Sequence, residues 1–248
     1  MKTLDFNNYD EIKSVFKPKA IDTDNLKEWY DKDVISTKIS DDYSLVYIVL
    51  DPDVNDAKTW RLITLEDALT WGVTPLEIHN DAIINDANHV PRLYLVDDYI
   101  AALKYGDFRV GGTYDLEKDD LYGLIDLEEG DTPGFIVTYG AACYASSIMA
   151  RPDALKTIAE GIGGGFYIMA LNGHTLRIGK DNIDDLDFYL KLARDQEKNR
   201  SKRDGEYLSS KLEHYDPKTG RLENAEKWAA KVRKKERKGG VWRRKCLR

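Results

Sequence analysis

The stretch FYIMALNGHTLRI at residues 166–178 decides the fold class of this 248-residue chain. Its two halves, Phe166–Ala170 and Thr175–Ile178, are rich in aromatic and aliphatic residues of the kind that favours strands. Asn172-Gly173 between them is a residue pair that favours a two-residue type I′ turn. The stretch therefore predicts an antiparallel hairpin.

A second hairpin is predicted from Ser44–Leu50 (SLVYIVL) and Thr59–Ile63 (TWRLI), which flank a polar connection at residues 51–58. Further strands are expected at Arg92–Val96 and Gly134–Tyr139. Because hairpins alternate with helical segments, the sequence predicts an α+β fold of antiparallel hairpins with interspersed helices and a basic C-terminal helix and tail.

Capping residues mark several helix starts. Thr74-Pro75-Leu76-Glu77 places a capping Thr before Pro at the first helical position and Glu at the third, which is a capping box. Pro152 begins a helix that Gly161 is expected to close, and a last helix is predicted from Leu222 to Lys238, ended by Gly239-Gly240. Other helices are expected at residues 9–16, 24–32, 64–71 and 97–105, and after Asn182.

These elements divide the chain into an N-terminal helical segment (residues 1–34), an α+β body (residues 35–222) and a basic C-terminal helix and tail (residues 223–248). Charge is also divided between the two ends of the chain. Residues 1–190 contain 17 Lys and Arg against 35 Asp and Glu, a net charge of −18, whereas residues 191–248 contain 20 against 9, a net charge of +11. An acidic body with a basic tail indicates an anionic partner for the tail, or contact between the tail and an acidic body.

The expected compartment is the cytoplasm. Cys143 and Cys246 are too few for a disulfide framework, which favours a reducing environment. The N-terminal residues contain no apolar stretch like that of a signal peptide, and no apolar run approaches the length of a membrane span. We therefore expect no membrane partner.

Two motifs resemble ligand loops without fitting them. Gly161–Gly165 follows a predicted helix and precedes a strand, which is the reverse of a phosphate loop, so a helix C-cap is favoured. Asp51, Asp53 and Asn55 match the first calcium ligands of an EF-hand, but Asp56 replaces the required Gly and Leu62 the required Glu.

Histidine and cysteine spacing gives no metal or catalytic constellation. His79, His89, His174 and His214 form no pair with ligand spacing, and Cys143 is interpreted as a buried structural thiol. His79 is expected to be a hydrogen-bonded core residue. With no serine elbow, zinc helix, Walker loop or dinucleotide fingerprint, the sequence predicts no catalytic, cofactor or metal site.

The basic tail supplies the candidate partner-binding residues. Basic side chains of this density, with Trp228 and Trp242 among them, suggest contact with an anionic surface, although cations near a helix C-terminus also stabilise the helix dipole. The candidates are Lys231, Arg233, Lys234, Lys235, Arg237, Lys238, Trp242, Arg243, Arg244 and Lys245.

Several segments, taken in order, resemble an uncharacterised domain family of Firmicutes that is frequent in integrative and conjugative elements, near antirestriction-type genes. The resemblance covers roughly residues 35–222 and implies a mobile-element setting and no reaction. The family usually has a serine-rich segment after its FYI strand, where this chain has Met169-Ala170-Leu171-Asn172. The matching segments are ITL at 63–65, WGVT at 71–74, EIH at 77–79, GFIVTYG at 134–140, residues 154–168, LS at 208–209 and YDPKTG at 215–220.

Three functions remain open from the sequence. The leading hypothesis is a non-enzymatic macromolecule-binding accessory protein of a bacterial mobile element or phage, such as a counter-defence inhibitor that occupies a host nuclease complex. Its grounds are the missing catalytic constellation, the acidic body, which could mimic nucleic-acid phosphates or simply aid solubility, and the family resemblance. The alternative is a nucleic-acid-binding protein that uses the basic tail, and the third is a hydrolase with an unrecognised site.

Overall fold

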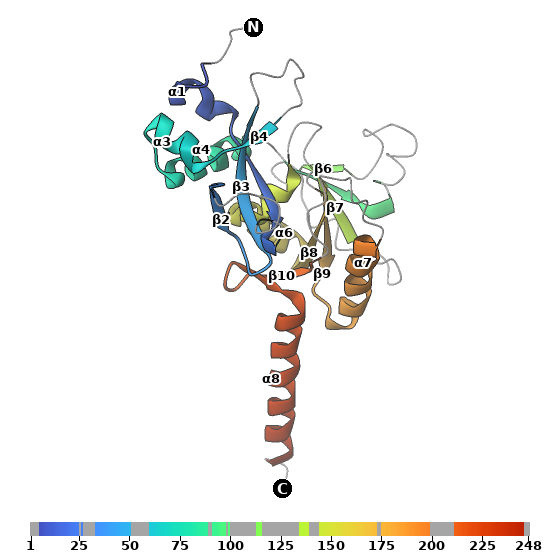
Figure 1. The fold of residues 1–248 in the computed structure, drawn as a ribbon. Coiled ribbons are helices and arrows are strands. Elements are labelled where there is room, and N and C mark those ends of the chain that lie inside the picture. The colour runs from blue at the N-terminus through green and yellow to red at the C-terminus, as the bar shows by residue number, and fades with distance from the viewer. Residues whose placement is uncertain are drawn as a thin grey trace.

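Two antiparallel sheets form the body of the computed structural model, and a long C-terminal helix extends from it (Figure 1). The structure describes residues 5–24, 26, 33–50, 60–88, 91–97, 99, 113–115, 134–138, 144–172, 175–198 and 211–245. Every strand pairing among these residues is antiparallel, which confirms the α+β class.

The first sheet is built around β3 (Tyr43–Leu50). One edge of β3 pairs with β1 (Lys17–Asp22), and the other pairs in succession with β2 (Ser36–Lys38) and β4 (Trp60–Leu62). The pairing of β3 with β4 confirms the predicted hairpin; its connection lies outside the described residues. Strand β1, which was not expected, lies inside the segment predicted to be helical, and Pro18 within it is compatible with an edge strand.

The second sheet has the strand order β11-β10-β8-β9-β7-β5-β6. The predicted hairpin of β8 and β9 lies at its centre. Asn172 belongs to β8 and pairs with Thr175, so the connection is residues 173–174, outside the described residues, and the predicted turn at Asn172-Gly173 was one position too early. The strands are β5 (Arg92–Leu95), β6 (Thr113–Asp115), β7 (Gly134–Thr138), β8 (Phe166–Asn172), β9 (Thr175–Lys180), β10 (Glu213–Asp216) and β11 (Arg221–Asn224).

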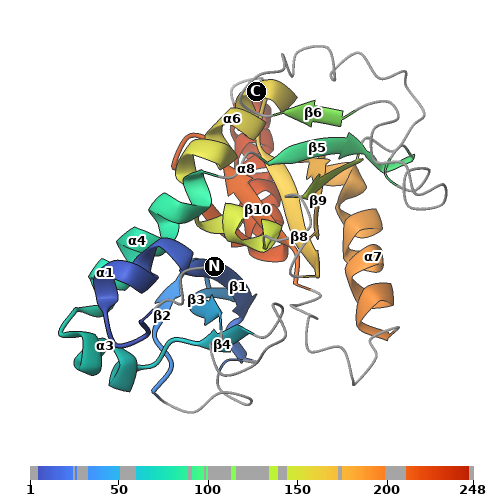
Figure 2. The ribbon, with the colours of Figure 1, turned by 90° about the horizontal axis from the view of Figure 1, so that it is seen from above.

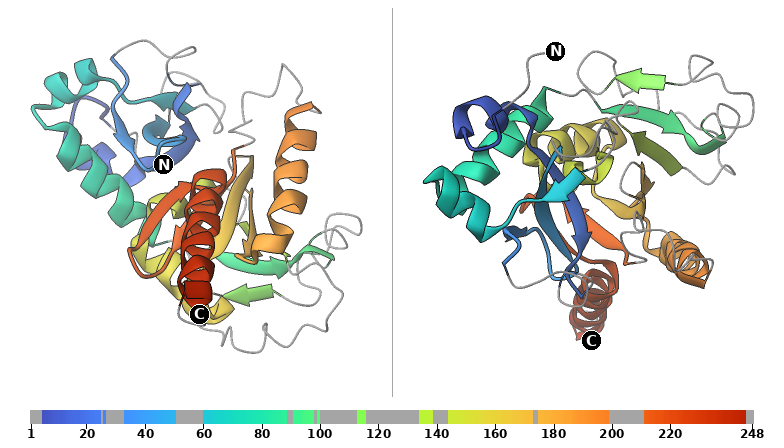
Figure 3. Two further views of the ribbon diagram at one scale, coloured as in Figure 1. Left: turned by 90° about the horizontal axis from the view of Figure 1, so that it is seen from below. Right: turned by 45° about the horizontal axis from the view of Figure 1, so that its top comes forward.

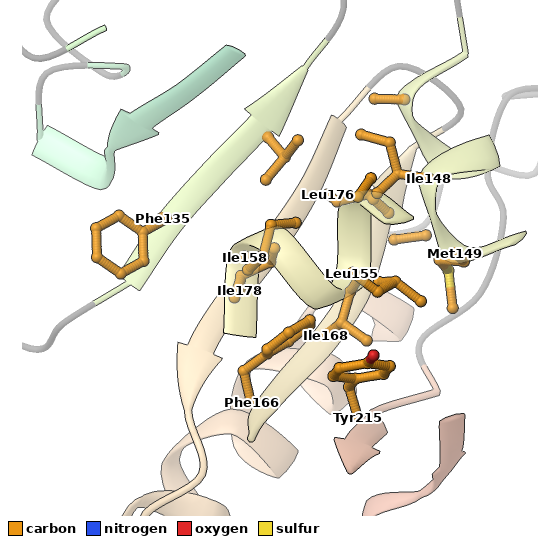
Figure 4. Packing of buried hydrophobic residues seen from close by; sticks show 14 of the residues in the cluster. Phe135, Ile148, Met149, Leu155, Ile158, Phe166, Ile168, Leu176, Ile178 and Tyr215 are labelled. Carbon is orange, nitrogen blue, oxygen red and sulfur yellow. The ribbon is translucent and has the colours of Figure 1, made fainter. Parts of the chain in front are cut away.

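Alternation along β8 separates two cores, because successive strand residues point to opposite faces. Phe166 and Ile168 join the central core, where they meet α6 (Pro152–Ile162), η3 (Ala145–Ala150) and residues of the first sheet (Figure 4). Tyr167 and Met169 face the opposite side, which is covered by α7 (Leu186–Lys198) and the start of α8 (Ala225–Lys245). The short helix η4 (Ile183–Asp185) leads into α7 and is capped by Asn182, as expected.

Helices α3 (Leu65–Trp71) and α4 (Pro75–Ala87) pack with the first sheet, together with α1 (Tyr9–Ile12) and η1 (Lys13–Val15), whereas α7 lies on the far side of the second sheet (Figure 2). Thr74 and Glu77 form the predicted capping box. Helix α6 continues to Ile162, so Gly163 and not Gly161 ends it, in a left-handed conformation with φ of 81°. The glycine stretch is thus a helix C-cap, as favoured from the sequence.

The last helix differs from its prediction at both ends. Leu222 belongs to strand β11, so α8 begins three residues later, at Ala225. Gly239-Gly240 does not end the helix, which continues to Lys245. Glycine costs a helix about 1 kcal/mol relative to Ala, and two such residues reduce helix stability without removing a backbone donor. The prediction of a stop at the glycine pair was therefore wrong.

Candidate functional site

Helix α8 starts on the edge of the second sheet, directly after β11. The Ala225 N–H donates to the Leu212 carbonyl at 3.0 Å. Asn224 Oδ1 accepts from the backbone N–H groups of Glu226 and Lys227 at 3.1 and 3.2 Å, so Asn224 caps the helix. These bonds fix the position of the first turn.

An apolar stripe holds the next turns of α8 on the sheet. Ala225 and Ala229 are buried, and the ring of Trp228 stacks on that of His214 with centroids 3.9 Å apart and an interplanar angle of 15°. His214 is buried on β10, and its Nε2 lies 3.1 Å from Asp181 Oδ2. The stack ties the helix to β10, and the hydrogen bond ties His214 to Asp181, the residue directly after β9.

The stripe reaches Val232, the last apolar residue among the side chains of α8 that the structure describes, and this residue is partly buried. Continued at helical spacing, the same line passes through Glu236, Gly239, Gly240 and Arg243, which offer no apolar face. We call residues 225–232 the anchored half and residues 233–245 the projecting half. Figures 1 and 3 show the projecting half extending away from both sheets, with the C-terminal end of α8 farthest from them.

The basic residues of α8 occupy the side opposite the apolar stripe. At 100° per residue, nine of its ten Lys and Arg positions fall within an arc of roughly 200° centred opposite the stripe, and Trp242 falls inside the arc. Only Arg243 falls on the stripe line. The nine positions are those of Lys227, Lys231, Arg233, Lys234, Lys235, Arg237, Lys238, Arg244 and Lys245.

Ion pairs with the body are confined to the anchored half among the described side chains of α8. Lys227 Nζ lies 2.7 Å from Asp41 Oδ2, and Lys231 pairs with Glu223. Arg233, Lys234 and Lys235 are exposed. The alternative drawn from the sequence, a tail folded back on its own acidic body, therefore fits the anchored half and not the projecting one.

All ten candidate partner-binding residues predicted from the sequence lie on α8. The structure gives side-chain surroundings for Lys231, Arg233, Lys234 and Lys235, and helix positions for the other six. The sequence did not reveal the anchor, because Asp181, His214 and Trp228 are far apart in the chain and share no motif. Only the apolar spacing of Ala225, Ala229 and Val232 pointed to a packed face.

A buried carboxyl lies on β10 beside the N-terminus of α8. Glu213 pairs in register with Asn224, and its Oε1 accepts a hydrogen bond from Ser40 Oγ at 2.5 Å. Its Oε2 has no hydrogen-bond partner among the described residues. Burial raises the pKa of Glu213 to about 7, against the opposing effect of the Ser40 hydrogen bond. This carboxyl joins the two sheets and titrates near neutrality.

Among the described residues, no group of three or more His, Cys, Asp and Glu side chains is placed to hold a metal ion. Within the same part of the chain, no helix has the length and apolar character to cross a membrane. His79 is hydrogen-bonded, as expected, with Nδ1 2.7 Å from the Tyr47 hydroxyl, but it is only partly buried and belongs to no core cluster. His89, His174, Cys143, Cys246 and residues 51–56, which include Asp51, Asp53 and Asn55, lie outside the described residues.

The fold and α8 together define an α+β protein with a projecting basic helix. The chain belongs to the family of unknown function DUF5688, whose model matches residues 1–216. The match includes the N-terminal segment, so it begins earlier than the resemblance noted at about residue 35, and it ends before β11 and α8. No curated protein and no solved structure matches the chain.

Proposed function

We propose that the protein binds nucleic acid, without catalysing a reaction, by placing α8 against the phosphate backbone. The observation that supports this proposal is the projecting half, where basic positions continue around one side of a helix that has left the body. An α-helix with its side chains is about 10–12 Å across and fits the major groove of B-DNA, which is about 12 Å wide.

The acidic body does not prevent this contact. From Val232 to Lys245 the helix rises by ~20 Å, which is more than twice the Debye length of about 8 Å at physiological salt. The charge of −18 carried by residues 1–190 is therefore largely screened at the end of α8. An acidic body repels a polyanion that binds close to it, and the projection of α8 weakens that repulsion.

The width of the basic arc favours nucleic acid over an acidic protein. A protein surface contacts one side of a helix, whereas a groove presents phosphates on both walls. An arc of roughly 200° places cations toward both walls at once. Trp242 inside the arc adds a ring on which a base of a single strand can stack.

The test is fluorescence anisotropy of the full chain with a labelled 20-base-pair DNA duplex, the same RNA duplex and a single strand, at 50 to 200 mM salt. The variant K234Q/K235Q/R237Q/K238Q removes four charges and keeps good helix-forming residues. We expect its affinity to fall by about 100-fold at 100 mM salt and its salt dependence to flatten, because fewer counterions are released. The matched control K156Q/K180Q/K191Q/K218Q removes four exposed charges of the body and should bind as the unaltered chain does.

An affinity for nucleic acid that does not change with salt concentration, or equal affinities of the two quadruple variants, would contradict the proposal. If no strand binds at 50 mM salt, an acidic protein becomes the favoured partner of α8. The mobile-element setting, the inhibition of a host nuclease complex and the cytoplasmic location stay predictions, and capture of such a complex by α8 would replace the nucleic-acid proposal.

A further inference from the structure

A pocket of about 330 Å³ opens where the first sheet meets the start of α6 and the turn between β10 and β11. Its volume lies within the range of small-molecule sites. Leu45, Met149, Leu155 and Leu222 supply apolar walls from four different elements. The pocket is thus formed by tertiary structure and lies apart from the projecting half of α8.

A chain of hydrogen bonds forms the polar side of this pocket. Thr37 Oγ1 lies 2.5 Å from the Tyr47 hydroxyl, which lies 2.7 Å from His79 Nδ1. Thr37 and His79 both line the pocket, while Tyr47 is fully buried behind them. Burial lowers the pKa of His79, so the imidazole is neutral at pH 7 and has one N–H to donate.

The charges around the pocket are all positive among its described lining residues. Lys38 and Arg221 line it, and no carboxylate does. Lys38 pairs with Asp41 at 3.0 Å, but both side chains are largely exposed, so this pair holds Lys38 weakly. Arg221 has no ion pair among the described residues, and its planar guanidinium can donate two parallel hydrogen bonds to a carboxylate or phosphate.

We propose that this pocket binds a small organic anion, whose apolar part contacts Leu155 and Leu222 and whose carboxylate or phosphate group contacts Arg221. The site is independent of the nucleic-acid contact proposed for α8. It belongs to the class in which apolar walls supply contact area and a few polar groups fix orientation.

A bound anion also sets the proton positions in the hydrogen-bond chain. An oxygen that accepts from His79 Nε2 requires the tautomer with its proton on Nε2. Tyr47 then donates to His79 Nδ1 and Thr37 donates to Tyr47, so each of the three groups donates once. Thr37 is therefore a positioning residue for His79.

Isothermal titration of the full chain with four naphthalene probes tests the proposal. The probes are 2-naphthoate, 2-naphthyl phosphate, 2-naphthalenemethanol and 2-naphthylmethylamine, which share one apolar part and differ in charge. We expect each acid to bind at least about tenfold more tightly than the alcohol, and the amine not to bind. Comparison of the two acids distinguishes a carboxylate site from a phosphate site.

Variants locate the binding. R221Q should lower the affinity for the tighter-binding acid about tenfold, and T37V should lower it less. R194Q, an exposed arginine of α7, and the K234Q/K235Q/R237Q/K238Q variant should bind it unchanged, which separates this pocket from α8. Any of four results would overturn the proposal: equal affinities for the alcohol and the acids, an affinity of R221Q equal to that of the unaltered protein, loss of binding in the α8 variant, or no heat from either acid at millimolar concentration.

Discussion

The two halves of α8 share one continuous backbone helix and differ in what surrounds it. In the anchored half, Ala225 and Ala229 are buried and Trp228 stacks on His214. In the projecting half, the same helical line carries Glu236, two glycines and Arg243, and the ribbon leaves the body (Figure 1). One helix therefore combines a segment fixed by packing with a segment that offers charge.

This difference shows why the helix can be long without a long apolar stripe. Starting a helix is the costly step, and adding residues to an existing turn is easier. The capped, packed anchored half provides that start. The projecting half then depends on its own helix propensity, which is high for its Lys and Arg residues and low for Gly239 and Gly240. Changes in the anchored half should therefore alter the stability of the protein, and changes in the projecting half should alter binding.

The largest expected effect is that of W228A. The substitution removes the ring that stacks on His214 and meets Tyr167 edge-on, with centroids 5.8 Å apart. We expect the free energy of unfolding to fall by about 3 kcal/mol, the low end of the range for core aromatic truncations, because Trp228 is partly buried. Urea denaturation measures this change. W228F, with a smaller aromatic ring, should show much of the same loss. A fall below 1 kcal/mol would show that the stack does not anchor α8.

Glu213, beside the N-terminus of α8, gives a pH-dependent test of the anchored half. Its pKa rises from its usual 4.5 to about 7 on folding, so the folded state holds a proton that the unfolded state has already lost. Stability from this group is present below pH 4.5 and is lost as the pH rises through 7, by about 3 kcal/mol in total. E213Q removes this loss, because a neutral amide imitates the protonated acid.

We therefore expect the free energy of unfolding of E213Q, relative to the unaltered protein, to improve by about 3 kcal/mol between pH 4.5 and pH 8. Urea denaturation at several pH values measures the difference. E226Q, an exposed carboxyl in the first turn of α8, is the matched control and should show no such change. Parallel pH profiles for E213Q and the unaltered protein would contradict the assignment of a buried, neutral Glu213.

Local signals in the sequence predicted much of this architecture. The strand pattern around residues 166–178 placed the central hairpin, the Thr74 capping box placed the start of α4, and β3 with β4 paired as expected. Strand β1 was missed because Lys17–Asp22 contains Pro and two Lys, and its pairing with β3 depends on a partner far along the chain. The helix stop predicted at the glycine pair was wrong because packing at the start of α8 supports later turns that composition alone does not favour.

The sequence also predicted one part of the candidate sites and missed the rest. Charge counts along the chain located the basic residues of α8, since helix charge can be read from composition. The pocket could not be located, because Thr37, His79 and Arg221 meet only through the packing of the first sheet, α4 and the β10–β11 turn. The raised pKa of Glu213 likewise depends on burial between two sheets, which no local pattern encodes.

A smaller effect is expected for W242A, the counterpart of W228A in the projecting half. We expect the free energy of unfolding to change by less than about 0.5 kcal/mol, because the apolar stripe ends ten residues earlier, at Val232. Affinity for a single strand should fall by about 1–2 kcal/mol, or roughly 5–30-fold, through loss of base stacking. A large loss of stability in this variant would show that the projecting half packs on the protein after all.

The smallest effects come from exchanging Gly and Ala between the two halves. G239A/G240A raises helix propensity in the projecting half by up to about 1 kcal/mol per residue, and A230G lowers it by the same amount at an exposed position of the anchored half. The double variant should leave urea unfolding unchanged, increase ellipticity at 222 nm and bind duplex DNA a few-fold more tightly, because less ordering remains to be done on binding. A230G should lower the free energy of unfolding by up to about 1 kcal/mol and leave the affinity unchanged. If both variants change stability and neither changes affinity, the two halves form one cooperative unit and the division of α8 into an anchor and a contact surface fails.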